Sequence, residues 1–483
     1  MSGIRNIRGR ALGLKGAAIL QFISKYSNVA IQLLVTAILA RLVSPEDFGL
    51  LALVSVFTSF FQIFADIGIS SAIIQYDDLT EHDYGALFFF TCLFALVVSC
   101  VFSLCSFPIS LVYGDKRLFP LCLSLTPSIL FSIANMVPNG LMLRDKRFAK
   151  IALRLIVVSI VSGSIAIVFA IMGAGCYALV AQTVISTALV LFWNLLSCPI
   201  KKINIHFVKP LNRVFSYSAF QFGFSLVNYF SRNLDNMLVG GTLGPSMLGY
   251  YDKAYKLTTY PMNNISAVIS SVVQPYMAKN QDEKSEMFRC WKKIVKPLSL
   301  VGGYITSIFI VAPYEVVVLF YGPGWDQAVV PFQLLGISVA FQMIGNPSGA
   351  FFQSLGRTDL MFRCGLINSF LSVSGALIGA MLGGINAIAA CVSIAYCFQV
   401  IPLGFYLLKT GMSASFNELK VFVPGLLLTI AAVFFNILFA EMLPMNIILR
   451  LLLKMCITFA IFFVGYFALS KLAKHFTIFR KLM

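Results

Sequence analysis

The chain has 483 residues, of which 59% are hydrophobic and only 11% charged, and its mean hydropathy is +0.88. This composition excludes an ordinary soluble globular protein and is typical of a chain that lies mostly in lipid. The 11 cysteines and three histidines follow no spacing typical of metal ligands or of a catalytic triad. They therefore argue against a disulfide framework, a metal site and triad-type catalysis.

Fourteen apolar windows are long enough to cross the hydrocarbon, which needs about 20 residues of α-helix. In chain order they lie at 17–40, 48–74, 84–112, 118–142, 151–172, 176–198, 214–241, 246–276, 295–320, 326–354, 361–382, 386–408, 421–440 and 446–470. Short turns at Ser44-Pro45 and Gly244-Pro245 separate the first window from the second and the seventh from the eighth. We therefore expect an all-α, polytopic membrane protein with about 14 transmembrane helices.

The net charge of +17 follows the predicted topology. With the N-terminus inside, the cytoplasmic segments carry most of the 36 Lys and Arg residues, and the opposite loops carry only Arg41, Lys116 and Arg117. The positive-inside rule then predicts that both termini are cytoplasmic. The basic charge is thus a topology signal, and no nucleic-acid partner is expected.

An internal repeat with an offset of 200 residues relates the two halves of the chain. LVSPEDFG at 42–49 aligns with TLGPSMLG at 242–249, and LVYG at 111–114 resembles LFYG at 319–322 at the slightly larger offset of 208. An even number of spans in each copy makes the copies parallel, an arrangement found in transporters. We expect an N-terminal six-helix lobe over 1–200, a C-terminal six-helix lobe over 201–410, and two additional helices with a cytoplasmic tail over 411–483.

Polar stripes run along several of these windows. Residues spaced three or four apart share one helix face. The stripes are Gln221, Ser225, Asn228, Arg232 and Asp235 in the seventh window; Gln21, Lys25, Asn28 and Gln32 in the first; Ser59, Gln62, Asp66 and Ser70 in the second; and Asp252, Lys253 and Lys256 in the eighth. Lipid does not tolerate such faces, so they are expected to line protein or water.

Depth along each helix, at about 1.5 Å per residue, predicts which charges meet. Arg232 and Asp235 fall at the depth of Asp252 and Lys256, and Lys25 falls at the depth of Asp66. For any single charge the alternative is a structural role, either as a buried ion pair or as a lysine that snorkels to the interface. Snorkelling is the expected account of four charges near span ends, Arg154, Glu315, Arg450 and Lys454.

Five motifs resemble those of a known transporter family. They are ARLVSPEDFGLLAL (40–53), FADIGISSAIIQ (64–75), SRNLDNMLVGG (231–241), LGYYDKAYKL (248–257) and GNPSGAFFQSLGR (345–357). Over residues 15–410 the chain resembles the polysaccharide transporter family of the multidrug/oligosaccharidyl-lipid/polysaccharide exporter superfamily, most closely its colanic-acid and teichuronic-acid exporter type.

This resemblance implies two six-helix lobes in a MATE-like V that work by alternating access. It implies a flippase of the bacterial inner membrane that moves an undecaprenyl-pyrophosphate-linked oligosaccharide to the outer leaflet for exopolysaccharide, capsule or O-antigen synthesis. Membrane lipids, a polysaccharide polymerase and a chain-length regulator are the implied partners. No cofactor is expected beyond coupling to a proton or sodium gradient.

The resemblance also implies site residues. Lys25, Arg232, Lys253 and Lys256 correspond to the family's basic cavity residues, which suit a pyrophosphate. The amides of Asn28, Gln32, Gln221 and Asn228 suit sugar hydroxyls, and Asp66, Asp235 and Asp252 are the ion-coupling candidates. No catalytic residue and no metal ligand is assigned.

Two other functions compete with this interpretation. A cation-coupled multidrug antiporter of the same fold needs carboxylates to exchange cations, whereas the charges predicted near the outer side are net positive. A membrane glycan polymerase or ligase usually needs a larger external loop, and the predicted external loops are all short. Both features favour the export of an anionic cargo by a protein that is not an enzyme.

Overall fold

The computed structural model describes residues 14–66, 69–75, 79–200, 203–205, 207, 229, 232–277, 283–439 and 446–475. Within these residues every regular element is a helix, which confirms the predicted all-α class. The chain divides into two compact units, Met1–Tyr229 and Phe230–Met483. The division into two six-helix lobes and a two-helix extension stays a prediction.

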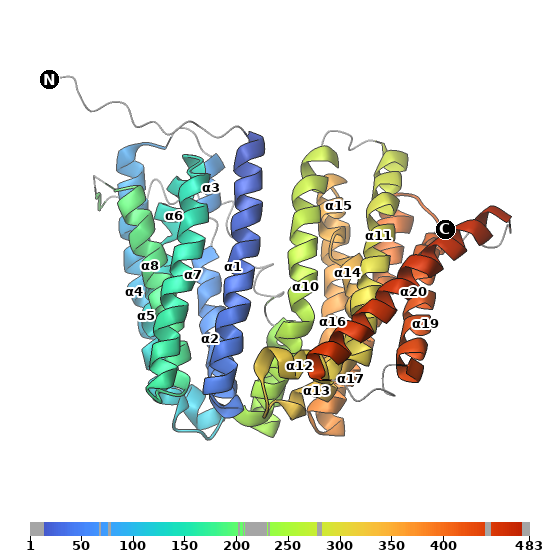
Figure 1. Cartoon of the computed structure of the whole chain (residues 1–483). Helices are drawn as coiled ribbons and strands as arrows, with labels where there is room; N and C mark the ends of the chain where they lie inside the picture. The colour runs from blue at the N-terminus through green and yellow to red at the C-terminus, as the bar shows by residue number, and fades with distance from the viewer. Residues whose placement is uncertain are drawn as a thin grey trace. The chain divides into compact units, whose positions relative to one another are not determined.

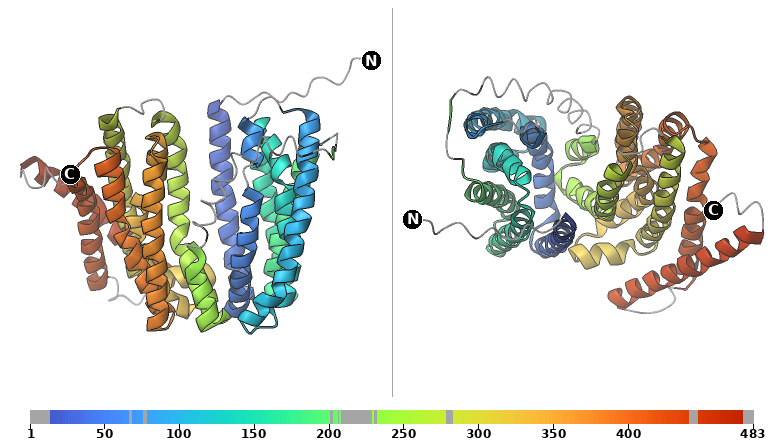
Figure 2. Two further views of the ribbon diagram at one scale, coloured as in Figure 1. Left: turned by 180° about the vertical axis from the view of Figure 1, so that it is seen from behind. Right: turned by 90° about the horizontal axis from the view of Figure 1, so that it is seen from above.

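The first unit is a bundle in which successive long helices run antiparallel (Figure 1). Pairs of neighbours are α1 with α7, α7 with α8, α4 with α5, and α5 with α8. Figure 2 shows the same helices from behind and end-on. The elements are α1 (Leu14–Leu42), α2 (Pro45–Gln62), η1 (Ile63–Asp66), α3 (Ile69–Gln75), α4 (Glu81–Val112), α5 (Leu118–Ala134), α6 (Met136–Arg144), α7 (Phe148–Ile171) and α8 (Cys176–Ser197).

The described part of the second unit starts with a helical segment at 232–243. The elements that follow are α10 (Pro245–Met277), α11 (Lys284–Val311), α12 (Pro313–Tyr321), η3 (Asp326–Ala328), α13 (Val329–Gly336), α14 (Val339–Gly345), α15 (Ser348–Ser354), α16 (Thr358–Leu382), α17 (Ile385–Phe398), α18 (Val400–Leu403), η4 (Gly404–Gly411), η5 (Phe416–Phe422), α19 (Val423–Phe439) and α20 (Ile447–His475). The last two helices pack against α11 and against each other.

Proline-containing turns begin helices at the two predicted positions. The Ser44 hydroxyl accepts the Asp47 N–H at 3.1 Å and caps α2, whose first residue is Pro45. Gly244 has a φ of +86°, a left-handed conformation that favours glycine, and Pro245 then begins α10. Both predicted turns are therefore confirmed.

Ten helices of the described chain are long and apolar enough to cross a membrane, or eleven if the bent pair Asp326–Gly336 and Val339–Ser354 is one broken span. The window at 48–74 falls short because η1 interrupts it, and the window at 246–276 because it is rich in polar residues. Most of the window at 214–241 lies outside the described residues. The chain is thus a multi-pass membrane protein, and the number of 14 spans is not confirmed.

Two glycines allow α16 and α17 to approach closely. A Cβ added to Gly379 would lie 2.5 Å from the Ile388 Cα, and one added to Gly375 would lie 2.9 Å from the Cys391 carbonyl oxygen. The glycines are four residues apart and therefore share a helix face. Small residues at this spacing let membrane helices associate through close backbone contact.

A buried ion pair attaches α20 to the rest of the second unit. Lys454 Nζ lies 2.7 Å from Glu315 Oε1 on α12 and donates to the Val311 carbonyl oxygen at 2.7 Å. The side chains of Lys454 and Glu315 are only 7% and 3% exposed, and Arg450 approaches Glu315 at 4.0 Å. Snorkelling is therefore the wrong account of Glu315 and Lys454, because both charges lie inside the protein with a partner.

Replacement of Gly379 by alanine is expected to destabilise the protein by about 1–3 kcal/mol, because the new methyl group overlaps the α17 backbone. A lower Tm of the purified protein in detergent measures this effect. The matched control is Gly365→Ala on the same helix, where a Cβ meets nothing within 4 Å. That variant should be neutral or more stable by up to about 1 kcal/mol, since alanine is the better helix former. Equal Tm changes in the two variants would contradict the close helix contact.

Lys454→Met should cost about 3–5 kcal/mol, because it removes the cation bound to the buried Glu315 carboxylate and leaves only Arg450, at 4.0 Å. The double variant Glu315→Gln/Lys454→Met buries no charge and should recover much of the lost stability. Thermal unfolding of the four proteins of this cycle gives the coupling energy. Simple additivity of the two single changes would show that the pair does not act as a unit.

Candidate functional site

The charged residues of α10 lie within the second unit in two different settings. Asp252 is buried, and its Oδ2 lies 2.8 Å from Lys256 Nζ one helical turn further along. The Lys256 side chain remains 56% exposed, so its ammonium is held by Asp252 but is still accessible. The pair forms within one helix, at the i,i+4 spacing that favours such contacts. The predicted contact of Arg232 and Asp235 with Asp252 and Lys256 on the next helix stays a prediction, and the pair seen here lies within one helix.

Lys253 is buried beside an aromatic ring. Its Nζ lies 5.9 Å from the centroid of the Tyr321 ring on α12, and the Tyr321 hydroxyl donates to the Lys253 carbonyl oxygen at 3.2 Å. A cation over the face of an aromatic ring is stabilised by the ring quadrupole. Since Lys253 is only 6% exposed, it does not snorkel to an interface.

Asp235 is buried next to a group of tyrosines. Its Oδ2 accepts the Tyr251 hydroxyl at 2.9 Å, and its Oδ1 accepts the Asn236 N–H at 2.8 Å. Tyr251 stacks on Tyr255, whose hydroxyl lies 3.2 Å from that of Tyr396 on α17. Depth along the helix predicted charged partners for Asp235, whereas the hydrogen bond that holds this carboxylate comes from a tyrosine.

Arg232 is exposed, three residues before Asp235 in the helical segment 232–243. The rest of its predicted stripe, including Gln221 and Asn228, lies outside the described residues. The structure therefore describes only the end of that stripe that carries Arg232 and Asp235.

In the first unit the predicted amides lie on α1. Asn28 Oδ1 accepts the hydroxyl of Ser159 on α7. Gln32 is exposed and lines a polar cavity, and Lys25 is half-buried. The side chain of Asp66, at the end of η1, is outside the described residues, so the pairing of Lys25 with Asp66 stays a prediction.

The polar cavity of the first unit has a volume of about 330 Å³. Its walls come from α1, α2, α5, α7 and α8. The lining residues are Gln32, Val35, Gln62, Ser132, Ser159, Ser162, Gln182, Thr183, Ser186 and Thr187. The sequence analysis identified Gln32 and Gln62 but missed the four residues on α8, although their spacing is the signal that revealed the other stripes.

A buried arginine lies elsewhere in the same unit. Arg154 on α7 donates to Asn194 Oδ1 at 2.5 Å and to Asn139 Oδ1 at 3.4 Å. Asn194 in turn donates to Asn135 Oδ1 at 2.8 Å, at the break between α5 and α6. Arg154 is only 8% exposed, so snorkelling is the wrong account of this residue.

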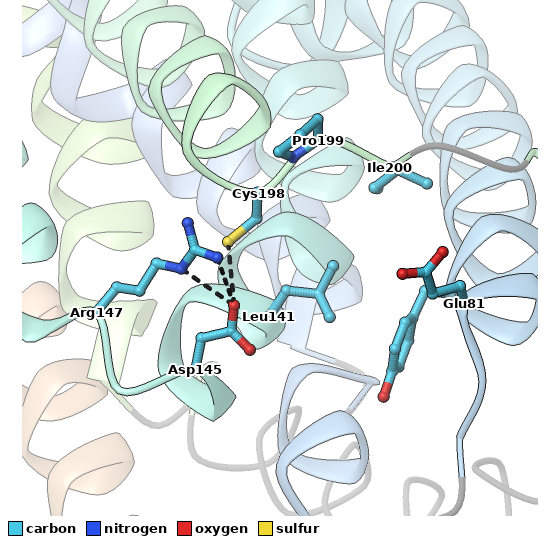
Figure 3. A pocket seen from close by; sticks show the side chains of 8 residues that line it. Glu81, Leu141, Asp145, Arg147, Cys198, Pro199 and Ile200 are labelled. Carbon is cyan, nitrogen blue, oxygen red and sulfur yellow. Dashed lines mark hydrogen bonds and ion pairs between the residues drawn. The ribbon is translucent and has the colours of Figure 1, made fainter. Parts of the chain in front are cut away.

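A second cavity, of about 280 Å³, lies where α4 begins and α8 ends (Figure 3). Arg147 pairs with Asp145 at 2.8 Å and donates to the Ser197 carbonyl oxygen, which satisfies a backbone acceptor at the end of α8. Glu81 adds a second carboxylate to the walls. One guanidinium that is already paired cannot attract an anion past two carboxylates, so we assign no site here.

The described residues give no support for a metal site. Among the described residues, no group of three or more His, Cys, Asp or Glu side chains is arranged to hold a metal ion. The assignment of the predicted residues to substrate binding or ion coupling stays a prediction.

Tyr251→Phe is expected to destabilise the second unit by about 1–3 kcal/mol, because it leaves a buried oxygen of Asp235 without its hydrogen bond. The matched control is Tyr250→Phe, since the Tyr250 ring packs on Trp325 at 5.7 Å and phenylalanine keeps that contact. The Tm of both variants in detergent checks the expectation. A Tyr251→Phe protein as stable as the control would show that the Asp235 contact contributes nothing.

Comparison with solved structures shows the fold. The lipid II flippase MurJ in its inward closed conformation superposes with a TM-score of 0.75 at 17% identity, over 93% of this chain and 98% of that chain. An inward-facing multidrug resistance MATE family transporter of the MOP superfamily gives a TM-score of 0.62 at 15% identity, over 80% of this chain and 94% of that one.

Comparison of sequences gives the family. The lipopolysaccharide biosynthesis protein WzxC of Escherichia coli (strain K12) is 23% identical over 81% of this chain and 80% of its own length. The teichuronic acid biosynthesis protein TuaB of Bacillus subtilis (strain 168) is 25% identical over 82% and 83%. The succinoglycan biosynthesis transport protein ExoT of Rhizobium meliloti (strain 1021) is 22% identical over 75% and 74%. Residues 38–330 match the family model described as polysaccharide biosynthesis protein, and the chain belongs to this family.

Proposed function

We propose that this protein is a flippase that moves an undecaprenyl-pyrophosphate-linked oligosaccharide from the cytoplasmic to the outer leaflet by alternating access. The observation that carries the proposal is the likeness of its fold to that of the lipid II flippase MurJ over 93% of the chain. The relatives named for lipopolysaccharide, teichuronic acid and succinoglycan biosynthesis support a cargo that is used for surface polysaccharide.

The chemistry of the predicted residues fits such a cargo. A pyrophosphate carries two or more negative charges, which are unfavourable in a low-dielectric region unless cations accompany them. The exposed guanidinium of Arg232 offers two parallel hydrogen bonds to a phosphate, and the accessible ammonium of Lys256 offers a point charge. Lys25 and Lys253 complete the proposed basic set, and the polyprenyl chain stays in lipid.

The same proposal includes the membrane, the topology, the partner proteins and the ion coupling. The membrane is the bacterial inner membrane, both termini are cytoplasmic, and a polysaccharide polymerase and a chain-length regulator act on the exported unit. Asp66, Asp235 and Asp252 are the proposed ion-coupling residues for a proton or sodium gradient. Of these, Asp235 is buried and hydrogen-bonded to a tyrosine, a setting in which a change of protonation alters a packed contact.

A cation-coupled multidrug antiporter is the second candidate, because the MATE family transporter shares the fold. The charges of the second unit weigh against it. Asp252 is already paired with Lys256, and Arg232, Lys253 and Lys256 outnumber Asp235 and Asp252. This balance suits an anionic cargo better than a cationic drug.

Arg232→Ala is expected to reduce polysaccharide export about 10- to 100-fold while the amount of protein in the membrane stays normal. The reason is that the loss of one charge-assisted contact corresponds to about 1.5–3 kcal/mol. Export is measured as surface glycan in a deletion strain that carries each variant. The control is Arg117→Ala, an arginine already bound to Asp115 and Glu46, which should leave export unchanged. Normal glycan output from the Arg232→Ala protein would overturn the assignment.

Two further variants separate the effect of the positive charge at Arg232 from the effect of its side-chain geometry. Arg232→Lys keeps the positive charge and should retain more export than Arg232→Gln, which keeps only hydrogen-bond donors. Equal losses in the two variants would indicate that Arg232 has a geometric or structural role, because its charge alone would then not explain the loss.

A further inference from the structure

The polar cavity of the first unit combines three properties. It measures about 330 Å³, its walls come from helices of a single compact unit, and nine of its ten lining residues carry an amide or a hydroxyl group. None of the ten is ionisable. The chemistry of the walls is therefore polar and neutral.

The depth of the cavity makes this polarity significant. Gln182 and Thr187 lie 6 and 11 residues after Cys176, the first residue of α8, which corresponds to about 9–17 Å along the helix. At this depth, within the hydrocarbon, polar groups cost free energy unless protein, water or ligand satisfies them. A concentration of nine such residues therefore calls for an occupant that forms hydrogen bonds.

The hydrogen bonds of the walls indicate what the occupant offers. Ser162 donates to the Val158 carbonyl at 2.7 Å, Thr183 to Leu179 at 3.1 Å, and Thr187 to Val184 at 2.9 Å. Each hydroxyl has a single proton, which is used within its own helix, so its oxygen is left as an acceptor. The amides of Gln62 and Gln182 add N–H donors to the same walls. An occupant that both donates and accepts, without charge, matches these walls.

Other ligand classes fit less well. A phosphate would find no cation on the walls, and a metal ion or a cationic drug would find no carboxylate. An alkyl chain would leave the hydroxyl and amide groups without partners. The volume corresponds to about eleven water molecules at about 30 Å³ each, which is enough room for one hexose together with water.

We propose that this cavity binds one uncharged sugar residue of the lipid-linked cargo. The inference rests on the proposed flippase function and assigns the recognition of the sugar to the first unit. It gives Gln62 and Gln182 the role of donors to sugar oxygens. The hydroxyl oxygens of Ser162, Thr183 and Thr187 accept hydrogen bonds from sugar hydroxyls. Water then occupies the cavity when no cargo is bound.

The test measures lipid binding to the purified full-length protein by native mass spectrometry. The probes are bare undecaprenyl pyrophosphate and the same lipid carrying one glucose, one galactose or one N-acetylglucosamine. The wild-type protein should retain at least one glycosylated lipid about 5-fold or more in preference to the bare lipid, which corresponds to one or two neutral hydrogen bonds. Gln182→Leu should lower this preference about 2- to 10-fold and leave binding of the bare lipid unchanged.

Matched variants separate the cavity from the general packing of the bundle. Ser162→Ala removes a buried hydroxyl that lines the cavity, and Ser128→Ala removes a buried hydroxyl on α5 that does not. Thr183→Val and Thr58→Val form a second pair, since both hydroxyls donate to a carbonyl of their own helix. Only Ser162→Ala and Thr183→Val should reduce the preference for the glycosylated lipid over the bare lipid. These smaller changes test the inference if Gln182→Leu fails to fold.

Two negative outcomes are distinguishable. If the wild type binds every lipid but shows no preference for a sugar, or if the cavity variants keep the preference, the cavity holds water only and the inference is overturned. If neither bare nor glycosylated lipid binds, the flippase assignment itself fails and the sugar site fails with it.

Discussion

A charge or a peptide group in the hydrocarbon of a membrane finds no water, and the structure of this protein follows from how each such group is satisfied within the chain. Helices satisfy the peptide groups. Among the charges, Glu315 is held by Lys454, and Arg154 is held by asparagine side chains rather than by a carboxylate. The same requirement explains why polar side chains gather on helix faces that meet protein instead of lipid.

The polar side chains of the first unit's larger cavity differ in kind from those on α10 of the second unit. In the first unit, the walls of the 330 Å³ cavity carry neutral amides and hydroxyls. On α10 of the second unit, Asp252, Lys253 and Lys256 follow one another within five positions. One position of the repeat shows the same contrast, because Gln32 aligns with Arg232 under the offset of 200 residues, whereas Lys25 aligns with Ser225. A cargo with a neutral glycan and an anionic pyrophosphate suits this division, since each kind of group needs a different partner.

Much of the fold follows from local patterns. The Ser44-Pro45 and Gly244-Pro245 turns begin helices as predicted, because proline fixes the first helical turn and glycine takes the left-handed conformation before it. Ten apolar windows became helices that can span a membrane. Prediction was weakest where polarity interrupts a window, as on α10, because hydropathy alone does not distinguish a polar span from a break. The predicted partners of charges were least reliable, since depth gives the height of a side chain and not the direction in which it points.

The sequence by itself determined the all-α membrane class, the turns, the family resemblance and the faces on which polar residues lie, because each is a property of one helix or of one short motif. Only the tertiary structure decided which side chains pair with each other. Asp235 binds Tyr251, and Lys454 binds Glu315, 139 positions away. The neutral cavity also needed five helices to assemble. Such contacts depend on which helices pack together and how closely, and that is set by close approaches such as the one at Gly379.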